Sequence, residues 1–197
     1  LAFDGTHIWI SHKLLVDGTY SNFVLKLRAS DGALVGDYPT DVGSVSNLFF
    51  DGTYIWTIGR RSSGAQGTIS KLRTSDGVVL ANYWVPAQSG NNSWPTRMVS
   101  DDTYIWVNNT ADSYILKLRK FDGAIADIYY VGYVPNLLTF DGTHIWAHRT
   151  QDNEISRWRV SDGVRVNSYS IGEEAMDMLF DGTYIWVSGS SGNIFKL

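Results

Sequence analysis

The feature that most constrains the fold is a seven-residue phrase that occurs five times. It reads FDGTHIW at 3–9 and 140–146, FDGTYIW at 50–56 and 180–186, and SDDTYIW at 100–106. Its first aspartates are Asp4, Asp51, Asp101, Asp141 and Asp181, at intervals of 47, 50, 40 and 40 residues. Periods of about 20–50 residues are typical of solenoids, propellers and repeat arrays. The chain is therefore expected to build one structural unit per repeat.

A second phrase lies between the copies of the first. It reads VLKLRASDG at 24–32, ISKLRTSDG at 69–77, ILKLRKFDG at 115–123 and ISRWRVSDG at 155–163, and a fifth copy is IFKL at 194–197. Asp-Gly between β-rich runs is a strong hairpin signal, because the tight turn needs backbone angles that glycine adopts readily. Each repeat is thus predicted to hold four strands, which in the second repeat are 47–50, 54–58, 68–73 and 78–84.

The apolar runs identify the type of sheet. Segments such as TYIWV at 103–107 are apolar at consecutive positions, so both sheet faces should be buried, and no run shows a helical period. Four-stranded units of about 40 residues that cover one another are propeller blades. We predict an all-β protein: a single β-propeller domain with five visible blades of four antiparallel strands. The blades span 1–40, 41–88, 89–134, 135–172 and 173–197, and the last lacks its outer strand.

The incomplete last blade leaves two explanations open. A strand preceding Leu1 completes the blade and closes the propeller at five, which we favour, or the parent chain carries further blades. An empty outer position would otherwise leave a sheet edge exposed.

Composition excludes several classes of function. The net charge of −4 argues against a nucleic-acid partner, which normally selects a basic surface. The chain contains no cysteine, so it has neither a disulfide framework nor a cysteine-ligated metal. No apolar run reaches membrane-spanning length, and membrane insertion is not expected. No cofactor is predicted.

Individual pieces of the repeat resemble a known group of proteins. IWVNN at 105–109, IWVSG at 185–189 and the KLR triplets at 26–28, 71–73 and 117–119 are similar to bacterial propeller repeats of the YVTN and NHL type, including those of streptogramin lyases. The resemblance implies a β-propeller fold, and an extracellular or periplasmic location is favoured. Its lyase members imply a magnesium site with a catalytic histidine and acid, a pattern that this sequence does not reproduce.

The repeated polar and aromatic residues are interpreted as structural. The aspartates fall in predicted turns, where their side chains stabilise the backbone. The repeat tryptophans (Trp9, Trp56, Trp106, Trp146 and Trp186) are expected to pack between blades. His7 and His144 occupy a position that is tyrosine in the other copies, and the Lys-x-Arg pairs are expected to lie between blades or near the turn aspartates.

Loop length points to a candidate binding face. The repeat tryptophan and the following Lys or Arg are 17 and 15 residues apart in the first two blades, against 11, 11 and 10 in the others. The insertions are SHKLLVDGTYSNF at 11–23, predicted as an extended hairpin, GRRSSGAQG at 59–67 and PAQSGNNSWPTR at 86–97. Variable loops carry specificity. The candidate binding residues are His12, Lys13, Arg60, Arg61, Asn91, Asn92 and Trp94, joined by His148 and Arg149 from a shorter polar loop.

Three possible functions follow. We favour a non-enzymatic binding or assembly module that recognises a glycan, peptide or protein partner through the loop face. Another possibility is a structural subunit, whose incomplete fifth blade self-associates by accepting a strand from another chain. The alternative is a metal-assisted lyase or hydrolase that uses His12 or His148 with Glu154. No catalytic or metal-binding residue is assigned, because nothing in the sequence places a nucleophile and a base together.

Overall fold

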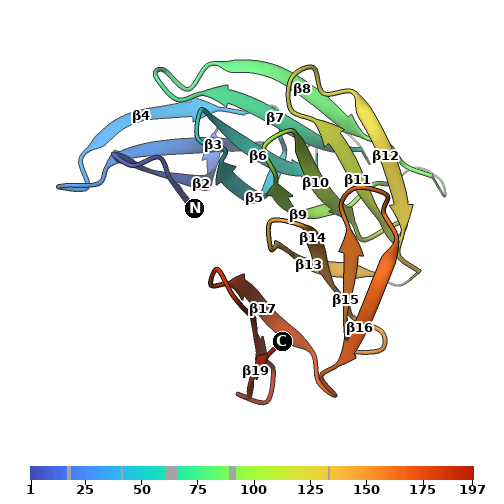
Figure 1. The fold of residues 1–197 in the computed structure, drawn as a ribbon. Helices are drawn as coiled ribbons and strands as arrows, with labels where there is room; N and C mark the ends of the chain where they lie inside the picture. The colour runs from blue at the N-terminus through green and yellow to red at the C-terminus, as the bar shows by residue number, and fades with distance from the viewer. Residues whose placement is uncertain (17–18, 41, 61–65, 89–91, 133) are drawn as a thin grey trace. The chain divides into compact units, whose positions relative to one another are not determined.

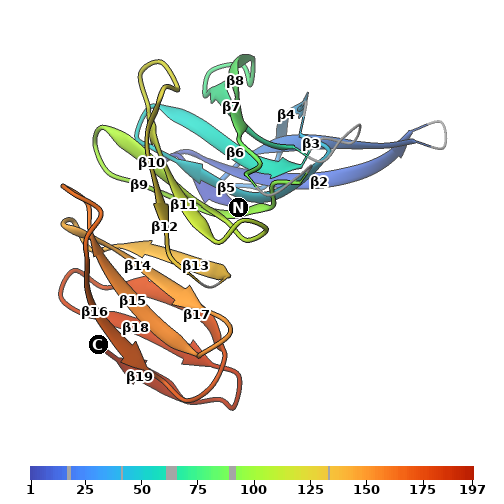
Figure 2. The ribbon, with the colours of Figure 1, turned by 90° about the vertical axis from the view of Figure 1, so that its right-hand side faces the viewer.

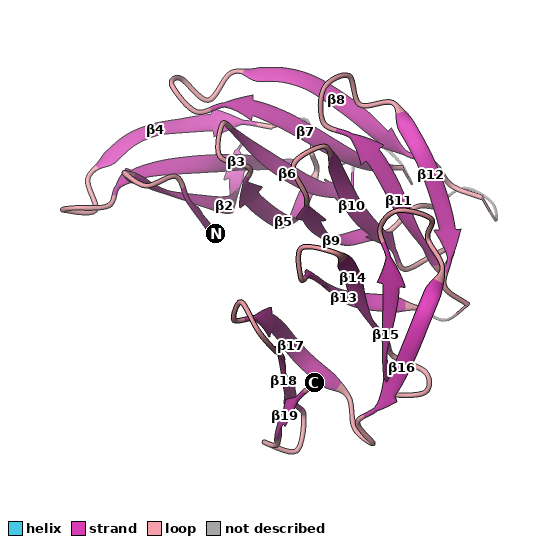
Figure 3. Cartoon of the chain, in the orientation of Figure 1, coloured by secondary structure: helices cyan, strands magenta, loops and turns pink. Residues whose placement is uncertain are grey.

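The computed structural model describes residues 1–16, 19–40, 42–60, 66–88, 92–132 and 134–197, with the backbone alone at 14–16 and 19–21. Within these residues the protein is all-β and contains no helix, as Figure 3 shows. In particular, no helix there has the length and hydropathy needed to cross a membrane. The strands form five antiparallel sheets, four with four strands and one with three. The prediction of an all-β propeller with a three-stranded last blade is confirmed.

The chain divides into two compact units, Leu1–Met98 and Val99–Leu197, with the boundary inside one strand. Unit 1 contains two complete sheets. The first runs in the order β1 (Ala2–Phe3), β2 (His7–Val16), β3 (Thr19–Arg28) and β4 (Leu34–Pro39). The second runs β5 (Ser44–Phe50), β6 (Tyr54–Arg60), β7 (Gly67–Arg73) and β8 (Val79–Val85), as Figure 1 shows.

Unit 2 contains the remaining sheets. The third sheet comprises β9 (Pro95–Ser100), in which the boundary falls, β10 (Tyr104–Asn109), β11 (Tyr114–Arg119) and β12 (Ile125–Tyr130). The fourth comprises β13 (Pro135–Phe140), β14 (His144–Arg149), β15 (Glu154–Arg159) and β16 (Arg165–Ser170). The fifth has β17 (Ala175–Phe180), β18 (Ile185–Gly189) and β19 (Ile194–Lys196). In the described part of the chain no strand pairs with the outer edge of β19.

The order of strands explains the pattern of burial. In β6 five consecutive residues from Ile55 to Gly59 are buried, so both faces of this strand are covered. The outer strand β12 is mostly exposed, because it has a neighbour on one edge only. Consecutive burial in the second strand of a sheet is what the apolar runs of the repeat predict.

Sheets pack face to face inside each unit. In unit 1, Trp9 and Val24 of the first sheet lie against Leu48, Ile55 and Leu72 of the second. In unit 2 the corresponding junctions bury Trp106 and Ile115 against Ile145 and Ala147, and Trp146 and Ile155 against Met178, Ile185 and Val187. The predicted packing of the repeat tryptophans between blades is confirmed at these three junctions.

The hairpin of β2 and β3 is much longer than the others. Each of its strands has 10 residues, and they stay paired from His7–Arg28 to Val16–Thr19. Figure 2 shows it extending past the other strands of unit 1. The prediction that the first insertion lengthens a hairpin is confirmed. Its Asp17-Gly18 tip lies outside the described residues.

One turn departs from the repeat in its chemistry. Gly5, Gly52, Gly142 and Gly182 have φ between 94° and 98°, a region that side chains rarely adopt. The sequence places Asp102 at the same position in the third sheet. Asp102 instead lies outside the positive-φ region, yet the turn keeps its Asp101 N–H to Tyr104 carbonyl bond at 3.1 Å. The backbone rearranges locally so that an ordinary residue fits.

Candidate functional site

The repeat aspartates are fully used by the fold. Asp4 Oδ1 accepts the backbone N–H groups of Thr6 and His7, at 2.9 and 2.7 Å, which is the turn-stabilising role expected of aspartate. Its other oxygen, Oδ2, accepts the indole N–H of Trp9 at 2.7 Å. The same carboxylate–indole bond recurs in every sheet, at 2.6–3.0 Å. Sequence reasoning missed this bond, although the constant Asp-to-Trp spacing of five residues signals it.

These bonds favour the ionised form of Asp4 and Asp141. Burial opposes ionisation of Asp4, but the hydrogen bonds from Trp9, Thr6 and His7 outweigh it and hold the pKa of Asp4 well below its ordinary value. The same balance lowers the pKa of Asp141. Carboxylates whose acceptor positions are occupied in this way are structural, and they offer little to a ligand.

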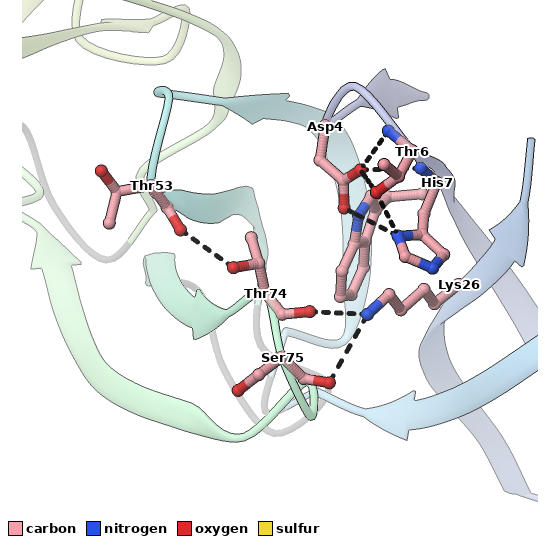
Figure 4. A network of polar contacts seen from close by, with 8 residues as sticks. Asp4, Thr6, His7, Lys26, Thr53, Thr74 and Ser75 are labelled. Carbon is pink, nitrogen blue, oxygen red and sulfur yellow. Dashed lines mark hydrogen bonds and ion pairs between the residues drawn. The ribbon is translucent and has the colours of Figure 1, made fainter.

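The basic residues of the repeat have two structural roles. The arginines form ion pairs with the aspartate of the following turn, for example Arg73 with Asp76 at 2.7 Å. The lysines reach into the next sheet. Lys26 Nζ donates to the Thr74 carbonyl at 2.7 Å, as Figure 4 shows, and Lys117 Nζ donates to the Val160 carbonyl at 2.8 Å. The prediction that these side chains lie between blades or near the turn aspartates is confirmed.

The β2–β3 hairpin carries the first candidate binding residues. His12 Nε2 lies 3.0 Å from Asp37 Oδ1 of β4, and its ring packs beside Phe23. This contact holds the imidazole in one orientation, with the partly exposed Asp37 as the orienting group. The next residue, Lys13, is exposed. No sequence pattern singles out Asp37, because it lies within an outer strand and belongs to no insertion.

A small hollow opens beside His12. It has a volume of about 160 Å³ and is lined by Ser11, His12, Lys13, Asn22, Ser44 and Val45. Asn22 is only 6% exposed and its side-chain amide donates to the Gly43 carbonyl, which ties the hairpin to the segment before β5. The hollow is therefore built from two neighbouring sheets, and five of its six lining residues are polar.

Arg60 and Trp94 form the second part of the candidate site. The Arg60 guanidinium carbon lies 4.9 Å from the centre of the Trp94 ring, a cation–π arrangement, and Trp94 is 48% exposed. Ser44, which lines the hollow, is paired with Arg60 between β5 and β6. The two parts are therefore continuous. We call His12, Lys13, Ser44, Arg60 and Trp94 the loop strip of unit 1.

Trp94 is presented by an anchored segment. The neighbouring Ser93 is completely buried, and its hydroxyl donates to the Val85 carbonyl at 2.8 Å and accepts the Gly67 N–H at 2.5 Å. A Cβ at Gly67 would lie 2.5 Å from the ring of Pro95, so the two segments are in close contact. Asn92 is exposed next to this anchor. Arg61 and Asn91, also candidates from the sequence, lie outside the described residues.

His148 and Arg149 are placed differently from the other candidates. Both are buried in unit 2, at 0% and 5% exposure. Arg149 forms ion pairs with Asp152 and Glu154, and the His148 Nε2 accepts the Ala175 N–H at 3.4 Å. Burial lowers the pKa of His148, while the nearby Glu174 and Asp152 act in the opposite direction. These residues stabilise the junction of the fourth and fifth sheets, and Glu154 is held by Arg149.

The described residues contain no cluster of three or more His, Asp or Glu side chains arranged to hold a metal ion. The loop strip offers cations, an exposed indole and a polar hollow. These groups are suited to binding a ligand that carries negative charge.

Comparison with known proteins supports the fold. No protein-family model matches the chain, and no curated protein sequence matches it. Among solved structures, a putative 6-phosphogluconolactonase from Bacteroides uniformis is 15% identical with a TM-score of 0.71, and covers 98% of this chain and 68% of its own. BamB from Moraxella catarrhalis is 15% identical with a TM-score of 0.65, over 95% of this chain and 57% of its own. The WD40 β-propeller domain of Doa1 is 14% identical with a TM-score of 0.67, over 92% and 61%.

The chain thus spans about 57–68% of the length of these three structures. At such low identity the likeness shows the fold alone. It confirms the β-propeller that the YVTN and NHL resemblance implied, whereas membership of that family is not shown.

Proposed function

We propose that the chain is a non-enzymatic binding module whose loop strip recognises an acidic segment of a peptide or protein partner. The observation that carries this proposal is the Arg60–Trp94 pair. Arg60 forms no ion pair with any residue that the structure describes, and its guanidinium lies against an indole that is half exposed. A cation oriented in this way is ready for a carboxylate from outside the chain.

The physical chemistry of such a pair favours a protein ligand. Arginine binds a carboxylate with two parallel hydrogen bonds, and these are stronger than neutral hydrogen bonds. Arginine and tryptophan are also the residues most often found at the energetic centre of protein interfaces. The exposed Lys13 and the polar hollow beside His12 extend the same site along unit 1. An extended acidic peptide fits this arrangement of an aromatic anchor and spaced cations.

Binding to a peptide library and to a glycan array tests the proposal. The wild-type chain is expected to retain peptides rich in Asp and Glu, and Arg60→Ala should weaken that binding by about tenfold or more. The matched control is Arg165→Ala, which removes an exposed arginine of β16 in unit 2 and should leave binding unchanged. Equal binding by the two variants, or selection of uncharged glycans, would contradict an acidic peptide ligand.

A second candidate function is assembly through the fifth sheet, as the three-stranded sheet suggests. The specific observation is the 64% exposure of Ile194 on β19.

We also propose a relation to the YVTN and NHL repeats, supported by IWVNN at 105–109 and IWVSG at 185–189.

A further inference from the structure

The third sheet departs from the repeat at one residue of its first turn. Four copies of the seven-residue phrase have glycine after the turn aspartate, and the third copy has Asp102. The bond from the Asp101 N–H to the Tyr104 carbonyl is 3.1 Å long, the same as in the four turns with glycine. Asp101 Oδ1 also accepts the N–H groups of Thr103 and Tyr104, at 2.7 and 2.6 Å, as the other turn aspartates do. The turn is therefore complete without the carboxylate of Asp102.

Asp102 lines an open pocket within unit 2. The pocket has a volume of about 450 Å³ and lies between the third and fourth sheets, on the side of their turns. Pockets that bind small molecules measure roughly 300–1,000 Å³, so this one can take a small molecule or one long side chain. All of its lining residues belong to unit 2: 101–104 and Lys117 of the third sheet, and Phe140, Gly142, Val160 and Ser161 of the fourth.

Asp102 is the charged group of this lining that the fold leaves unused. It is exposed, and its side chain forms no hydrogen bond or ion pair with any residue that the structure describes. Asp101, by contrast, uses both oxygens, because its Oδ2 accepts the Trp106 indole N–H at 3.0 Å. Lys117 is only 9% exposed, and its Nζ donates to the Val160 carbonyl at 2.8 Å. A charged ligand of this pocket is therefore expected to be positive.

The charged groups next to the pocket are satisfied within the fold. Arg119 forms an ion pair with Asp122 at 2.6 Å, and Arg159 forms one with Asp162 at 3.1 Å. Asp141 precedes the lining residue of the fourth sheet's first turn, and its two oxygens accept N–H groups of that turn and of the repeat tryptophan. A cation that enters the pocket is thus directed to Asp102.

The oxygen atoms of the lining suit an organic cation better than a metal ion. Calcium takes roughly six to eight oxygen ligands, whereas Asp102 supplies the one unoccupied carboxylate of this lining. The exposed Thr103 and Ser161 add two hydroxyl groups, which form no hydrogen bond with any described residue. A primary ammonium group has three N–H donors, so one carboxylate and two hydroxyl groups match its needs.

Apolar groups lie beside these oxygen atoms. Tyr104, Phe140 and Val160 are partly buried and pack against the core between the third and fourth sheets, and all three line the pocket. A single exposed ion pair contributes little to binding. Contact between this apolar wall and an alkyl chain must therefore supply a large part of the affinity.

We propose that this pocket binds a primary ammonium group on an apolar stem, with Asp102 as its counter-ion. A free alkylamine and the lysine side chain of a partner share this chemistry. The pocket lies in unit 2 and selects a positive charge, whereas the loop strip lies in unit 1 and selects a negative one. The inference goes beyond the proposed function and does not depend on it.

Titration with n-pentylammonium, followed by NMR of the backbone amides of the whole chain, tests the proposal. The amide signals of 101–104, 140–142 and 160–161 are expected to shift, with a Kd of about 1 mM or below. Asp102→Gly restores the residue of the other four copies, and Asp102→Asn keeps the size of the side chain, so both variants should fold. Each should weaken binding by about tenfold or more. Glu174→Gln is the matched control, since it removes an exposed carboxylate of unit 2 outside the pocket and should bind like the wild type.

Two further probes separate charge from stem and identify the source of the amine. Pentanol has the same stem without the charge, and should bind at least about tenfold more weakly than n-pentylammonium. The N-acetyl, N-methylamide derivative of lysine carries the same ammonium group on a peptide backbone. If it binds as tightly as n-pentylammonium, the ligand is a partner's lysine, and if it binds more weakly, the ligand is a free amine; both results support the proposal.

Four results would overturn the proposal. The first is the absence of shifts in these amide signals up to about 20 mM n-pentylammonium. The second is equal binding by Asp102→Asn and the wild type. The third is equal binding of pentanol and n-pentylammonium, and the fourth is a loss in Glu174→Gln as large as that in Asp102→Asn, which indicates unspecific attraction to the net charge of −4.

Discussion

The fourth and fifth sheets carry the same repeat in different surroundings. Both contain the carboxylate–indole bond, at 2.8 Å between Asp141 and Trp146 and 2.6 Å between Asp181 and Trp186. Yet Trp146 is 5% exposed and stacks on Tyr169, 5.5 Å between ring centres, whereas Trp186 is only partly buried, and its sheet has three strands within the described residues. The turn is therefore a local property of the sequence, while the burial of the tryptophan is supplied by neighbours.

Removing the indole should give the largest difference in stability between the fourth and the fifth sheet. Trp146→Ala is expected to lower the free energy of unfolding by about 3–5 kcal/mol, because it leaves a cavity in a sealed junction. Trp186→Ala should cost only about 1 kcal/mol, in proportion to the smaller area that it buries. Urea unfolding at a concentration where the chain is monomeric measures both. Similar losses in the two variants would show that Trp186 is covered in solution by a contact within the chain.

Removing the carboxylate is the next test. Asp141→Ala leaves the Trp146 indole N–H and two backbone N–H groups without their acceptor, and should cost about 2–3 kcal/mol. Asp181→Ala should cost clearly less, since water reaches the same donors in the fifth sheet. Thermal unfolding of the two variants compares them. A larger loss of thermal stability in Asp181→Ala than in Asp141→Ala would contradict this expectation.

The buried histidine of the fourth sheet should add a dependence on pH. His148 corresponds to Ser188 in the fifth sheet, and burial lowers its pKa. The contribution of His148 to the free energy of unfolding is complete at pH values above the ordinary histidine pKa. It is lost as the pH falls below that value, because the unfolded chain then binds a proton that the folded chain does not. The free energy of unfolding should change by at most about 1.4 kcal/mol per pH unit through this residue. Melting temperatures at pH 7.5 and 5.5 should differ less in His148→Asn than in the wild type, and an unchanged difference would exclude this role.

The lysine contacts should give the smallest effect. Lys117→Met removes the hydrogen bond to the Val160 carbonyl and should cost about 1 kcal/mol. Lys196→Met should change stability by no more than about 0.5 kcal/mol in a monomer, as is usual for an exposed substitution. Chemical denaturation of both variants provides the measurement. If Lys196→Met is as costly as Lys117→Met, then Lys196 has an acceptor in solution.

The architecture was predictable because the repeat is local and periodic. Asp-Gly turns and the IW runs fixed the positions of strands such as β5 to β8 within a few residues. The candidate site was only partly predictable. Loop length pointed to Arg60 and Trp94, which the structure brings together, but it also selected His148 and Arg149, whose burial depends on Ala175, Asp152 and Glu154. Polarity in a short loop does not distinguish a solvated side chain from one that is sealed by the next sheet.

The carboxylate–indole bonds also give each sheet a spectroscopic signal of its own. Five of its eight tryptophans donate to an aspartate, one in each sheet, while Trp158 donates to the Ser156 hydroxyl. A proton shared with a carboxylate resonates away from one shared with water or a hydroxyl. Indole proton spectra recorded during gradual denaturation would therefore follow each sheet by its own signal, and repeat proteins are the class in which sheets can open one at a time.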